Sequence, residues 1–558
     1  MTRDVSISGG HLLLRCLLAQ DARVAFGVPG ESYLDVLDAM HEHRADFSFV
    51  GARHEGGAAF MAEAFAKLTG RPGICFVTRG PGASNAAIGI HAARQASTPL
   101  ILFVGQIATV DRGREAFQEI DYRAYFGGVA KWVTEIDHVD RIAEIVARAF
   151  SVALSGRPGP VVVALPEDVL SARTTAAPAA ATPIAEPAPA RETVNAMAAL
   201  LADAQRPLLL VGGGGWQRAS RDPLRAFAER HRLPVVATFR CNDLFDNASP
   251  SYVGEAGVAM RGHVRELITD ADLILAVGIR FGEMTTDAYR LLSPPQARQR
   301  LVHMHPDAGE LGKIYQAALA AQVGVNAAAK ALGELDLGQS WDDWCAGARA
   351  RFEASLECPP QPGDLDMGRV CAWLREHLAG DAIITNGAGN FATWPGKYLT
   401  YVDERRLLAP QSGAMGYGLP AAVAAKSVYP ERCVVCFAGD GDLQMNMAEL
   451  GTAMQIDARP IVLVVNNQMY GTIRMHQEKH YPARVSGTDI VNPDFVAIAG
   501  AYGMHAERIE RTDDFAAAFA RAVSSPTGAL LELMVDPEAL TPEQTVSGLR
   551  DAAGGDAS

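Results

Sequence analysis

Two apolar, strand-like runs in the last third of the chain are followed by side chains that can bind a metal. Asp440 follows the run VVCFAG, and Asn467, 27 positions later, follows the run PIVLVVN. A carboxylate and an amide oxygen at neighbouring strand ends are ligands for a hard divalent cation such as Mg²⁺. Gly439 and Gly441 leave bare backbone before a helix whose N-terminus attracts an anion. The pattern predicts a diphosphate and metal site. GDG alone is more simply a Gly-Asp turn, but the later NN favours the site.

A second candidate lies near the other end of the chain. The segment RHEGGAAF places Glu55 before two glycines and the apolar run MAEAFAKL. An acid at the start of a buried helix costs free energy unless something specific requires it. The alternative is an acid that interacts favourably with the helix dipole.

The elements that position these residues follow from the repeating pattern of the chain. Short β-branched runs alternate with Ala-rich helical stretches, which predicts an α/β protein with parallel sheets. Most of the strand-like runs end in Gly or Asn, and ligands of open α/β sheets collect at the carboxyl ends of strands. The first and last parts share this plan, which suggests related architecture.

Two proline-rich stretches divide the chain. TTAAPAAATPIAEPAPA (174–190) and FEASLECPPQPGDLD (352–366) are interpreted as linkers. The predicted domains are therefore 1–173, 191–351 and 367–545, followed by a tail at 546–558. A chain of 558 residues is too long for a single hydrophobic core, and each predicted domain is large enough to have its own.

Composition excludes several classes of function. The formal net charge of −14 argues against a nucleic-acid surface. We expect no membrane segment and no signal peptide, and hence a cytoplasmic location, because no apolar run is long enough and the first residues lack a cleavage pattern. Cys433 and Cys436 have CxxC spacing within a strand-like run, so core thiols are favoured over a metal or redox pair.

These motifs resemble a known family. GDG followed at this distance by NN is similar to the diphosphate and metal motif of thiamine-diphosphate-dependent enzymes. The block RHEGGAAFMAEAFAKLTGRPGICFVTRGPGASN resembles the pyrimidine-binding domain of the branch that contains acetolactate synthase, pyruvate oxidase and benzaldehyde lyase. The resemblance covers essentially the whole chain. It implies three doubly wound parallel-sheet domains, pyrimidine-binding, central and diphosphate-binding, and thiamine diphosphate with Mg²⁺. It also implies active sites between the subunits of a homodimer or tetramer.

The resemblance assigns roles in the diphosphate domain. Asp440, Asn467 and the backbone carbonyl of Met469 would ligate Mg²⁺. Asp442 stands where many relatives have Ser or Ala, so it must turn away from the diphosphate or bind nearby N–H groups. Gly389, Asn390, Phe391 and Gly441 are expected to contact the diphosphate, although relatives commonly have a Gln-His pair at the first of these segments. Gly413 would offer its carbonyl to the 4′-amino group. Met415 would be the apolar wedge that bends the cofactor, and without a cofactor it would be a core residue.

For Glu55 the resemblance implies a hydrogen bond to N1′ of the aminopyrimidine. Such a charge-assisted bond is strong away from water. It favours the 4′-imino tautomer, which takes the proton from C2 of the thiazolium and leaves the nucleophilic carbanion. The glycines after Glu55 would let the pyrimidine ring come close.

Three further residues are expected to select the substrate. Glu31, in PGES where synthases have Pro-Gly-Gly-Ala, is either a proton donor or part of a helix N-terminal region. Gln118, beside Phe117 in GREAFQEIDY, would line the site and bind a 2-oxo or hydroxy group. His476 occupies the place of a tryptophan that sets acceptor preference in the synthases. It either binds a substrate carboxylate, acts as an acid or base, or is a partly exposed helix residue.

The central domain raises the question of a nucleotide. A strand followed by four glycines, LLLVGGGGWQ, suits one, and relatives hold FAD or ADP there. However, GGGG is not GxGxxG, and EAGVAMRG and IRFGEMTT match the flavin-contact segments of synthases poorly. The sequence therefore weighs against FAD.

The leading function is a thiamine-diphosphate-dependent carboligase, a transferase or lyase, which decarboxylates a 2-oxo acid and joins the enamine to a second carbonyl. The alternative, favoured by Glu31, is a decarboxylase or a lyase of 2-hydroxy ketones that protonates the enamine. A non-catalytic binding protein is a third hypothesis. It predicts the loss of Glu55, Asp440 or Asn467, and all three are present.

Overall fold

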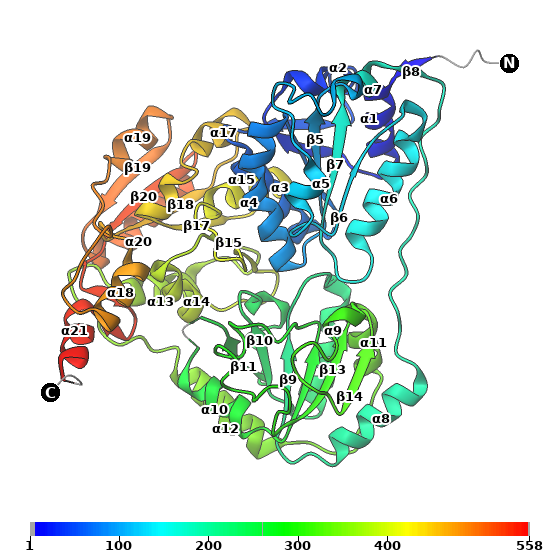
Figure 1. Cartoon of the computed structure of the whole chain (residues 1–558). Coiled ribbons are helices and arrows are strands. Elements are labelled where there is room, and N and C mark those ends of the chain that lie inside the picture. Colours follow the sequence, from blue (N-terminus) through cyan, green and yellow to red (C-terminus); the bar gives the residue numbers. More distant parts are fainter. Residues whose placement is uncertain (1–5, 259, 556–558) are drawn as a thin grey trace. The chain divides into compact units, whose positions relative to one another are not determined.

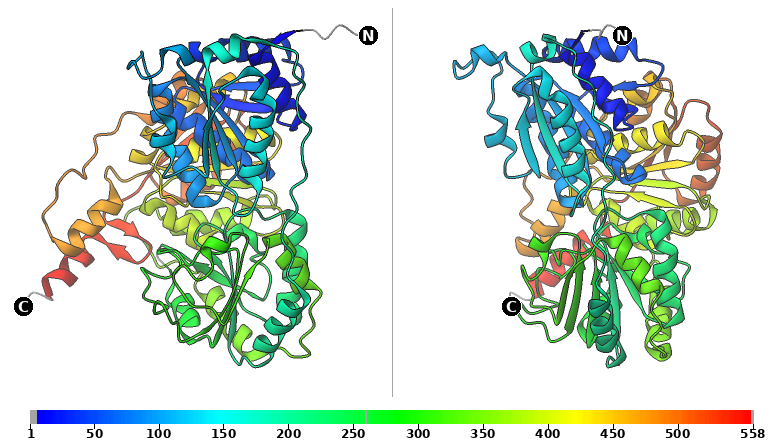
Figure 2. Two further views of the ribbon diagram at one scale, coloured as in Figure 1. Left: turned by 45° about the vertical axis from the view of Figure 1, so that its right-hand side comes forward. Right: turned by 90° about the vertical axis from the view of Figure 1, so that its right-hand side faces the viewer.

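The computed structural model describes residues 6–258 and 260–555, and Figures 1 and 2 show its course. Three six-stranded sheets account for most of the strands. The chain divides into two compact units. Unit 1 comprises Met1–Ala185, Leu419–Pro430 and Asn446–Ala458, and unit 2 comprises Glu186–Gly418, Glu431–Met445 and Arg459–Ser558. The prediction of an α/β fold with three parallel sheets is confirmed.

Unit 1 contains a parallel sheet of order β3-β2-β4-β5-β7-β6. Its strands are β2 (Val24–Gly27), β3 (Ser48–Gly51), β4 (Gly73–Val77), β5 (Leu100–Gln106), β6 (Trp132–Glu135) and β7 (Pro160–Pro166). The helices between them are α1 (Gly9–Ala19), α2 (Leu34–Glu42), α3 (Glu55–Thr69), α4 (Gly80–Ala96), α5 (Tyr122–Phe126), α6 (Ile142–Leu154) and α7 (Glu167–Ser171). A short antiparallel pair, β1 (Ile7–Ser8) and β8 (Arg173–Thr174), closes this part of the chain.

Burial on both faces of the sheet explains its continuous apolar strands. Every residue of β4, β5 and β7 is buried, as expected for a parallel sheet covered by helices. Helix α3 is also buried along most of its length and packs closely on α4. A Cβ on Gly89 of α4 would lie 2.3 Å from Cβ of Ala59, so only glycine permits this approach.

The second sheet lies in unit 2 and has the order β11-β10-β9-β12-β13-β14. Its strands are β9 (Pro207–Val211), β10 (Val235–Thr238), β11 (Tyr252–Ala256), β12 (Leu273–Val277), β13 (Arg300–His305) and β14 (Leu319–Gln322). If these six strands are numbered 1 to 6 along the chain, their order in the sheet is 3-2-1-4-5-6, which is a doubly wound arrangement. Figure 1 shows α9 (Arg221–Arg230) and α11 (Val325–Gly333) on one face, and α10 (Gly262–Asp270) and α12 (Asp342–Ala354) on the other; α8 (Arg191–Ala202) precedes the sheet.

The third sheet, also in unit 2, has the order β16-β15-β17-β18-β20-β19. Its strands are β15 (Ile383–Asn386), β16 (Arg406–Leu408), β17 (Val434–Gly439), β18 (Ile461–Asn466), β19 (His505–Ile509) and β20 (Ala529–Met534). Counted within each sheet, this order is the same as in unit 1, 2-1-3-4-6-5, so the shared plan of the first and last parts is real. Cys436 is buried within β17, and Cys433 lies just before that strand, half-buried.

The helices of this last part belong to both units. Unit 2 contains α13 (Met367–His377), α14 (Thr393–Tyr398), α16 (Asp440–Gln444), α18 (Gly471–His480), α19 (Phe495–Ala501), α20 (Phe515–Ser524) and α21 (Val546–Gly555), with the hairpin β21 (Ala539–Thr541) and β22 (Gln544–Thr545). Helix α17 (Glu449–Gln455) and most of α15 (Gly418–Val428) belong to unit 1.

The proline-rich stretches differ from each other in detail. Residues 175–190 contain neither helix nor strand, and Figure 2 shows them as an extended run. In the stretch 352–366, α12 continues to Ala354, because Phe352 is part of the buried core. The segment 546–558, which the sequence suggested to be a tail, is mostly helical: Val546–Gly555 form α21, and residues 556–558 lie outside the described part. Within the described residues, no helix has both the length and the apolar composition of a bilayer span.

Candidate functional site

A cavity of about 270 Å³ lies in unit 2, beside the carboxyl ends of β15, β17 and β18. These strands are parallel neighbours, so the residues that follow them meet at one edge of the sheet. Ten residues expected from the sequence to bind the cofactor line this cavity: Gly389, Asn390, Phe391, Gly413, Met415, Asp440, Gly441, Asp442, Asn467 and Met469.

Asp440 begins α16 directly after β17 and is only 3% exposed. One carboxylate oxygen accepts the N–H of Gly441 (2.9 Å), and the other accepts the N–H of Gln468 (2.9 Å) and Nδ2 of Asn492 (2.7 Å). All three donors are neutral, and burial raises the pKa of this carboxyl. A divalent cation bound here would offset the cost of the buried charge. The donor set therefore fits the metal that the sequence predicts.

The two asparagines at the end of β18, Asn466 within the strand and Asn467 directly after it, have different partners. Asn466 donates from Nδ2 to Glu532 of β20 at 2.8 Å, inside the sheet. Asn467 lines the cavity, and its Oδ1 accepts the N–H of Met469 at 3.3 Å. Gln468, between Asn467 and Met469, has a φ of 59°, so the chain turns sharply there. This turn brings both predicted metal-binding positions after the strand to the cavity wall.

Asp442 is a buried residue of the cavity wall. Its Oδ1 accepts the N–H groups of Ala388 (3.0 Å) and Gly416 (2.9 Å). Of the two arrangements that the sequence left open, the structure has the one in which the side chain binds neighbouring N–H groups. A Cβ on Gly387 would lie 2.0 Å from this oxygen. Burial raises the pKa of Asp442 to about 7. The carboxyl links three segments of the wall.

The glycines of the GDG motif have a packing role that the sequence did not reveal. A Cβ on Gly439 would lie 2.7 Å from the ring of Phe391, and one on Gly441 would lie 2.7 Å from the ring of Tyr470. Bare backbone at these positions admits two aromatic rings of the cavity wall. By contrast, Gly413 has no atom within 4 Å of a Cβ position, and its φ of 69° is what favours glycine there.

Glu55 is the first residue of α3 in unit 1 and is half-buried. Its Oε2 accepts a hydrogen bond from Nδ2 of Asn85 on α4 at 2.8 Å. The following glycines have a reason within the unit, since a Cβ on Gly57 would lie 2.4 Å from a carboxylate oxygen of Glu449. Close approach of a buried side chain, rather than of a ligand, therefore explains Gly57.

The other predicted residues of unit 1 gather around Arg79. Glu31, whose side chain is 70% exposed, pairs with the Arg79 guanidinium at 3.0 Å, and Glu167 pairs with it at 3.2 Å. The backbone carbonyl of Phe117 accepts a hydrogen bond from Arg79 Nη1 at 3.5 Å. The backbone carbonyl of Gln118 accepts the N–H of Gly80, the residue after Arg79, at 3.2 Å. Within the chain the Glu31 carboxyl is thus an exposed group that pairs with Arg79.

His476 lies apart from the cavity lining. It is exposed on α18, and its ring is parallel to that of His480 at a centroid distance of 6.3 Å. The first turn of the same helix does line the cavity, through Gly471, Thr472 and Ile473.

Several residues that hold the site were not found from the sequence. Asn85 and Arg79 lie in the block TRGPGASN, which was recognised as a whole and not residue by residue. Asn492 and Glu449 had no signal, because each acts on a residue that is 52 or more positions away.

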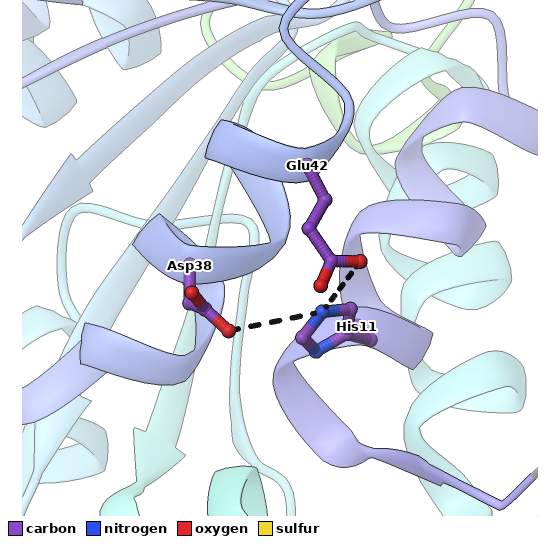
Figure 3. A group of neighbouring side chains, drawn as sticks. All are labelled: His11, Asp38 and Glu42. Atoms are coloured by element: carbon purple, nitrogen blue, oxygen red, sulfur yellow. Dashed lines mark ion pairs between the residues drawn. The ribbon is translucent and has the colours of Figure 1, made fainter.

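A histidine with two acids forms a separate cluster in unit 1, which Figure 3 shows. Nε2 of His11 lies 3.2 Å from Glu42 and 3.9 Å from Asp38, and its Nδ1 lies 2.8 Å from Oγ of Ser8. The two acids are one helical turn apart on α2 and exposed. Both ring nitrogens thus have protein partners, and the cluster ties α1 to α2.

The four-glycine strand end of the central sheet packs closely against a neighbouring strand end. A Cβ on Gly213 would lie 2.2 Å from the carbonyl oxygen of Gly278, and one on Gly278 would lie 2.6 Å from that of Gly212. The indole of Trp216 donates to the carbonyl of Gly212 at 2.9 Å. Packing within the chain therefore explains Gly213 and Gly278.

Family models match all three parts of the chain. Residues 7–125 match the N-terminal TPP binding domain of thiamine pyrophosphate enzymes, 194–332 match their central domain, and 387–533 match their C-terminal TPP binding domain. All three models describe one class of protein, the thiamine pyrophosphate enzymes.

Curated proteins give a finer comparison. The chain is 34% identical to the acetolactate synthase large subunit of Parasynechococcus marenigrum, over 95% of this chain and 88% of that protein. It is 31% identical to the acetolactate synthase isozyme 2 large subunit of Escherichia coli, over 95% of this chain and 96% of that protein. The chain therefore belongs to the thiamine pyrophosphate enzyme family, in its acetolactate synthase-like group, and the resemblance seen in the sequence is confirmed.

Proposed function

We propose that this protein is a thiamine-diphosphate-dependent carboligase. It decarboxylates a 2-oxo acid, releases CO₂, and joins the remaining acyl carbon to a second carbonyl compound. The observation that carries the proposal is the cavity of unit 2, which is lined by all ten residues expected there. When bound, thiamine diphosphate supplies the carbon nucleophile and the electron sink for this chemistry.

We assign the metal to Asp440, Asn467 and the carbonyl of Met469. A buried carboxylate with neutral donors, an amide oxygen and a backbone carbonyl suit Mg²⁺, which prefers oxygen ligands. The diphosphate would lie along Gly389–Phe391, Gly441 and Asp442, which leaves Gly413 and Met415 for the rings. Asp442 binds two backbone N–H groups and so holds the wall rather than repelling the diphosphate.

Glu55 is proposed as the catalytic carboxylate that holds the pyrimidine N1′ proton. Its hydrogen bond from Asn85 fixes one oxygen and leaves the other to accept or donate. Glu31, Gln118 and His476 are proposed to contact the substrate. The pairing of Glu31 with Arg79 would hold its carboxyl in place, either to orient substrate or to donate a proton to it.

We further propose that the metal is Mg²⁺, that two or four copies of the chain assemble with active sites between subunits, and that the protein is cytoplasmic. The substrates are proposed to be small 2-oxo acids, with a 2-oxo acid or an aldehyde as acceptor. FAD or ADP in the central domain is not part of the proposal, because packing against Gly278 already explains Gly213 at the four-glycine strand end.

Product analysis tests this function. The protein is incubated with thiamine diphosphate, Mg²⁺ and ¹³C-labelled pyruvate, alone and then with an added aldehyde, and the products are identified by NMR. A carboligase gives a labelled acetolactate-type acid or 2-hydroxy ketone in at least one of the two reactions. Acetaldehyde without any ligated product would instead establish a simple decarboxylase.

A further inference from the structure

Glu449 is a buried acid that the proposed chemistry does not use. It is the first residue of α17 and has no exposed surface. Its Oε1 accepts the backbone N–H groups of Arg53 (3.2 Å) and His54 (3.0 Å). Its Oε2 lies 3.2 Å from the same Arg53 N–H and accepts the hydroxyl of Thr452 at 2.5 Å. A carboxylate far away in sequence thus binds the two amides that come directly before Glu55.

The first turn of α3 is built to admit this carboxylate. A Cβ on Gly57 would lie 2.4 Å from Glu449 Oε1 and 2.8 Å from its Cδ. Contacts below 3 Å are not tolerated, so any larger residue at 57 displaces the acid. Glycine is otherwise a poor residue inside a helix. Its use here therefore indicates that the approach of Glu449 matters more than the helix propensity of α3.

Further bonds fix the same segment. The guanidinium of Arg53 donates to Oε1 of Gln455 (2.8 Å) and to the carbonyl of Gly451 (3.2 Å), both on α17. Nδ1 of His54 accepts the N–H of Gly56 at 3.0 Å and caps α3. The backbone on the N-terminal side of Glu55 is therefore held at several points, while Asn85 holds its side chain.

We propose that Glu449 is a positioning residue for Glu55, and that Gly57 is glycine so that the Glu449 carboxylate can reach the amides of Arg53 and His54. This inference rests on the proposed function, in which Glu55 acts on the cofactor. It predicts that Glu449 affects cofactor activation while cofactor affinity changes little, because the residues expected to bind the diphosphate belong to unit 2.

The hydrogen bonds that the Glu449 carboxyl accepts affect its pKa. Burial raises the pKa of Glu449, whereas the hydrogen bonds from Thr452, Arg53 and His54 lower it. Charge-assisted bonds to backbone N–H groups are stronger than neutral ones. A single oxygen of Glu449 accepts both N–H groups, however, so an amide of the same shape can hold the segment about as well.

The test compares Glu449→Ala, Glu449→Gln and Gly57→Ala with Glu63→Ala as a control. Glu63 is a buried acid of the same helix that binds Thr98 at 2.8 Å and pairs with Lys67. Its loss weakens α3 without releasing the start of the helix. Two rates are measured: amide hydrogen exchange of residues 52–58 in the cofactor-free protein, by mass spectrometry, and C2–H/D exchange of bound thiamine diphosphate, by NMR.

We expect Glu449→Ala and Gly57→Ala to speed amide exchange at 52–58 by at least about tenfold and to slow C2–H/D exchange by at least about tenfold. The dissociation constant of thiamine diphosphate should change by less than about threefold. Glu449→Gln should stay within about threefold of wild type in both rates, because one oxygen can accept both N–H groups. Alanine is the better helix former at 57, so a loss there cannot come from a weaker helix.

Other results would contradict the positioning role of Glu449 or the proposed function of Glu55. If Glu449→Ala and Gly57→Ala slow C2–H/D exchange no more than Glu63→Ala does, or leave amide exchange unchanged, the positioning role is refuted. If Glu449→Ala does not fold, Gly57→Ala decides alone. If Glu55→Gln itself leaves C2–H/D exchange unchanged, the proposed function fails and this inference fails with it. If Glu55→Gln abolishes that exchange and Gly57→Ala does not slow it, only this inference fails.

Discussion

Glu478 joins the helix that begins at the cavity to the last helix of the described chain. It lies on α18, and its side chain is fully buried. Arg550 of α21 binds both carboxylate oxygens, at 3.0 and 2.7 Å, and Arg474 donates to one of them at 2.9 Å. The N–H of Ala483 donates to the other at 2.9 Å. We predict that Glu478→Gln releases α21 and loosens the first turn of α18.

The size of the effect follows from the pKa of this carboxyl. The bonds from Arg550, Ala483 and Arg474 lower it from 4.5 to about 2. A carboxyl with such a shift stabilises the fold by about 3 kcal/mol at neutral pH. Arg550 is 41% exposed, so solvent screening reduces this, and we expect about 1–2 kcal/mol. Because the pKa of the folded state is lowered, this stability is fully present above pH 4.5 and is lost as the pH falls toward 2.

Urea unfolding at pH 7 and at pH 4, together with amide exchange of residues 546–555, measures this effect. Glu478→Gln should lower the free energy of unfolding or the protection of α21 by about 1–2 kcal/mol at pH 7, and by less at pH 4. Asp513→Asn is the matched control, because its pair with Arg369 is exposed and should contribute under about 1 kcal/mol. Equal effects of Glu478→Gln and Asp513→Asn, or an equal loss at both pH values, would show that the Glu478 carboxylate does not hold α21 through its charge.

Three further predictions address the site and the fold. Asp440→Asn should weaken Mg²⁺-dependent binding of thiamine diphosphate by at least about a hundredfold, measured by fluorescence titration, because it removes the charge of a proposed ligand; binding within threefold of wild type would exclude Asp440 as a ligand. Asn85→Ala should slow C2–H/D exchange of bound cofactor about tenfold, since it frees one oxygen of Glu55, whereas unchanged exchange would show that Asn85 does not orient it. Gly213→Ala should destabilise unit 2 by about 2 kcal/mol or more in thermal unfolding, because its Cβ would lie 2.2 Å from a backbone carbonyl oxygen; an unchanged melting temperature would contradict the close packing described there.

The fold was largely predictable from the sequence, because its signals are local. Alternation of apolar strands with Ala-rich helices specifies a parallel α/β sheet. Asp440 and Asn467 were predictable for a related reason, because they directly follow parallel strands and such positions converge at one edge of a sheet. The other cavity residues of unit 2 were expected from the resemblance to a known family.

The residues that hold the site in place could not be predicted in this way. Glu449 acts on amides 395 and 396 positions away, and Asn492 acts on Asp440 across 52 positions through a loop. Neither has a local pattern. Gly57 and Gly441 were interpreted as places for a ligand to approach, yet a carboxylate and an aromatic ring of the protein lie against them. Sequence alone does not distinguish bare backbone that admits a ligand from bare backbone that admits a side chain.

Glu55 is proposed to make this chain an enzyme that activates thiamine diphosphate. The rate of C2–H/D exchange of bound thiamine diphosphate, compared between the wild type and Glu55→Gln, tests this role. We expect an exchange rate in the wild type far above that of free cofactor, and a loss of at least about a hundredfold in the variant, because the amide cannot take part in the proton transfer at N1′. Equal rates in the two proteins would contradict it.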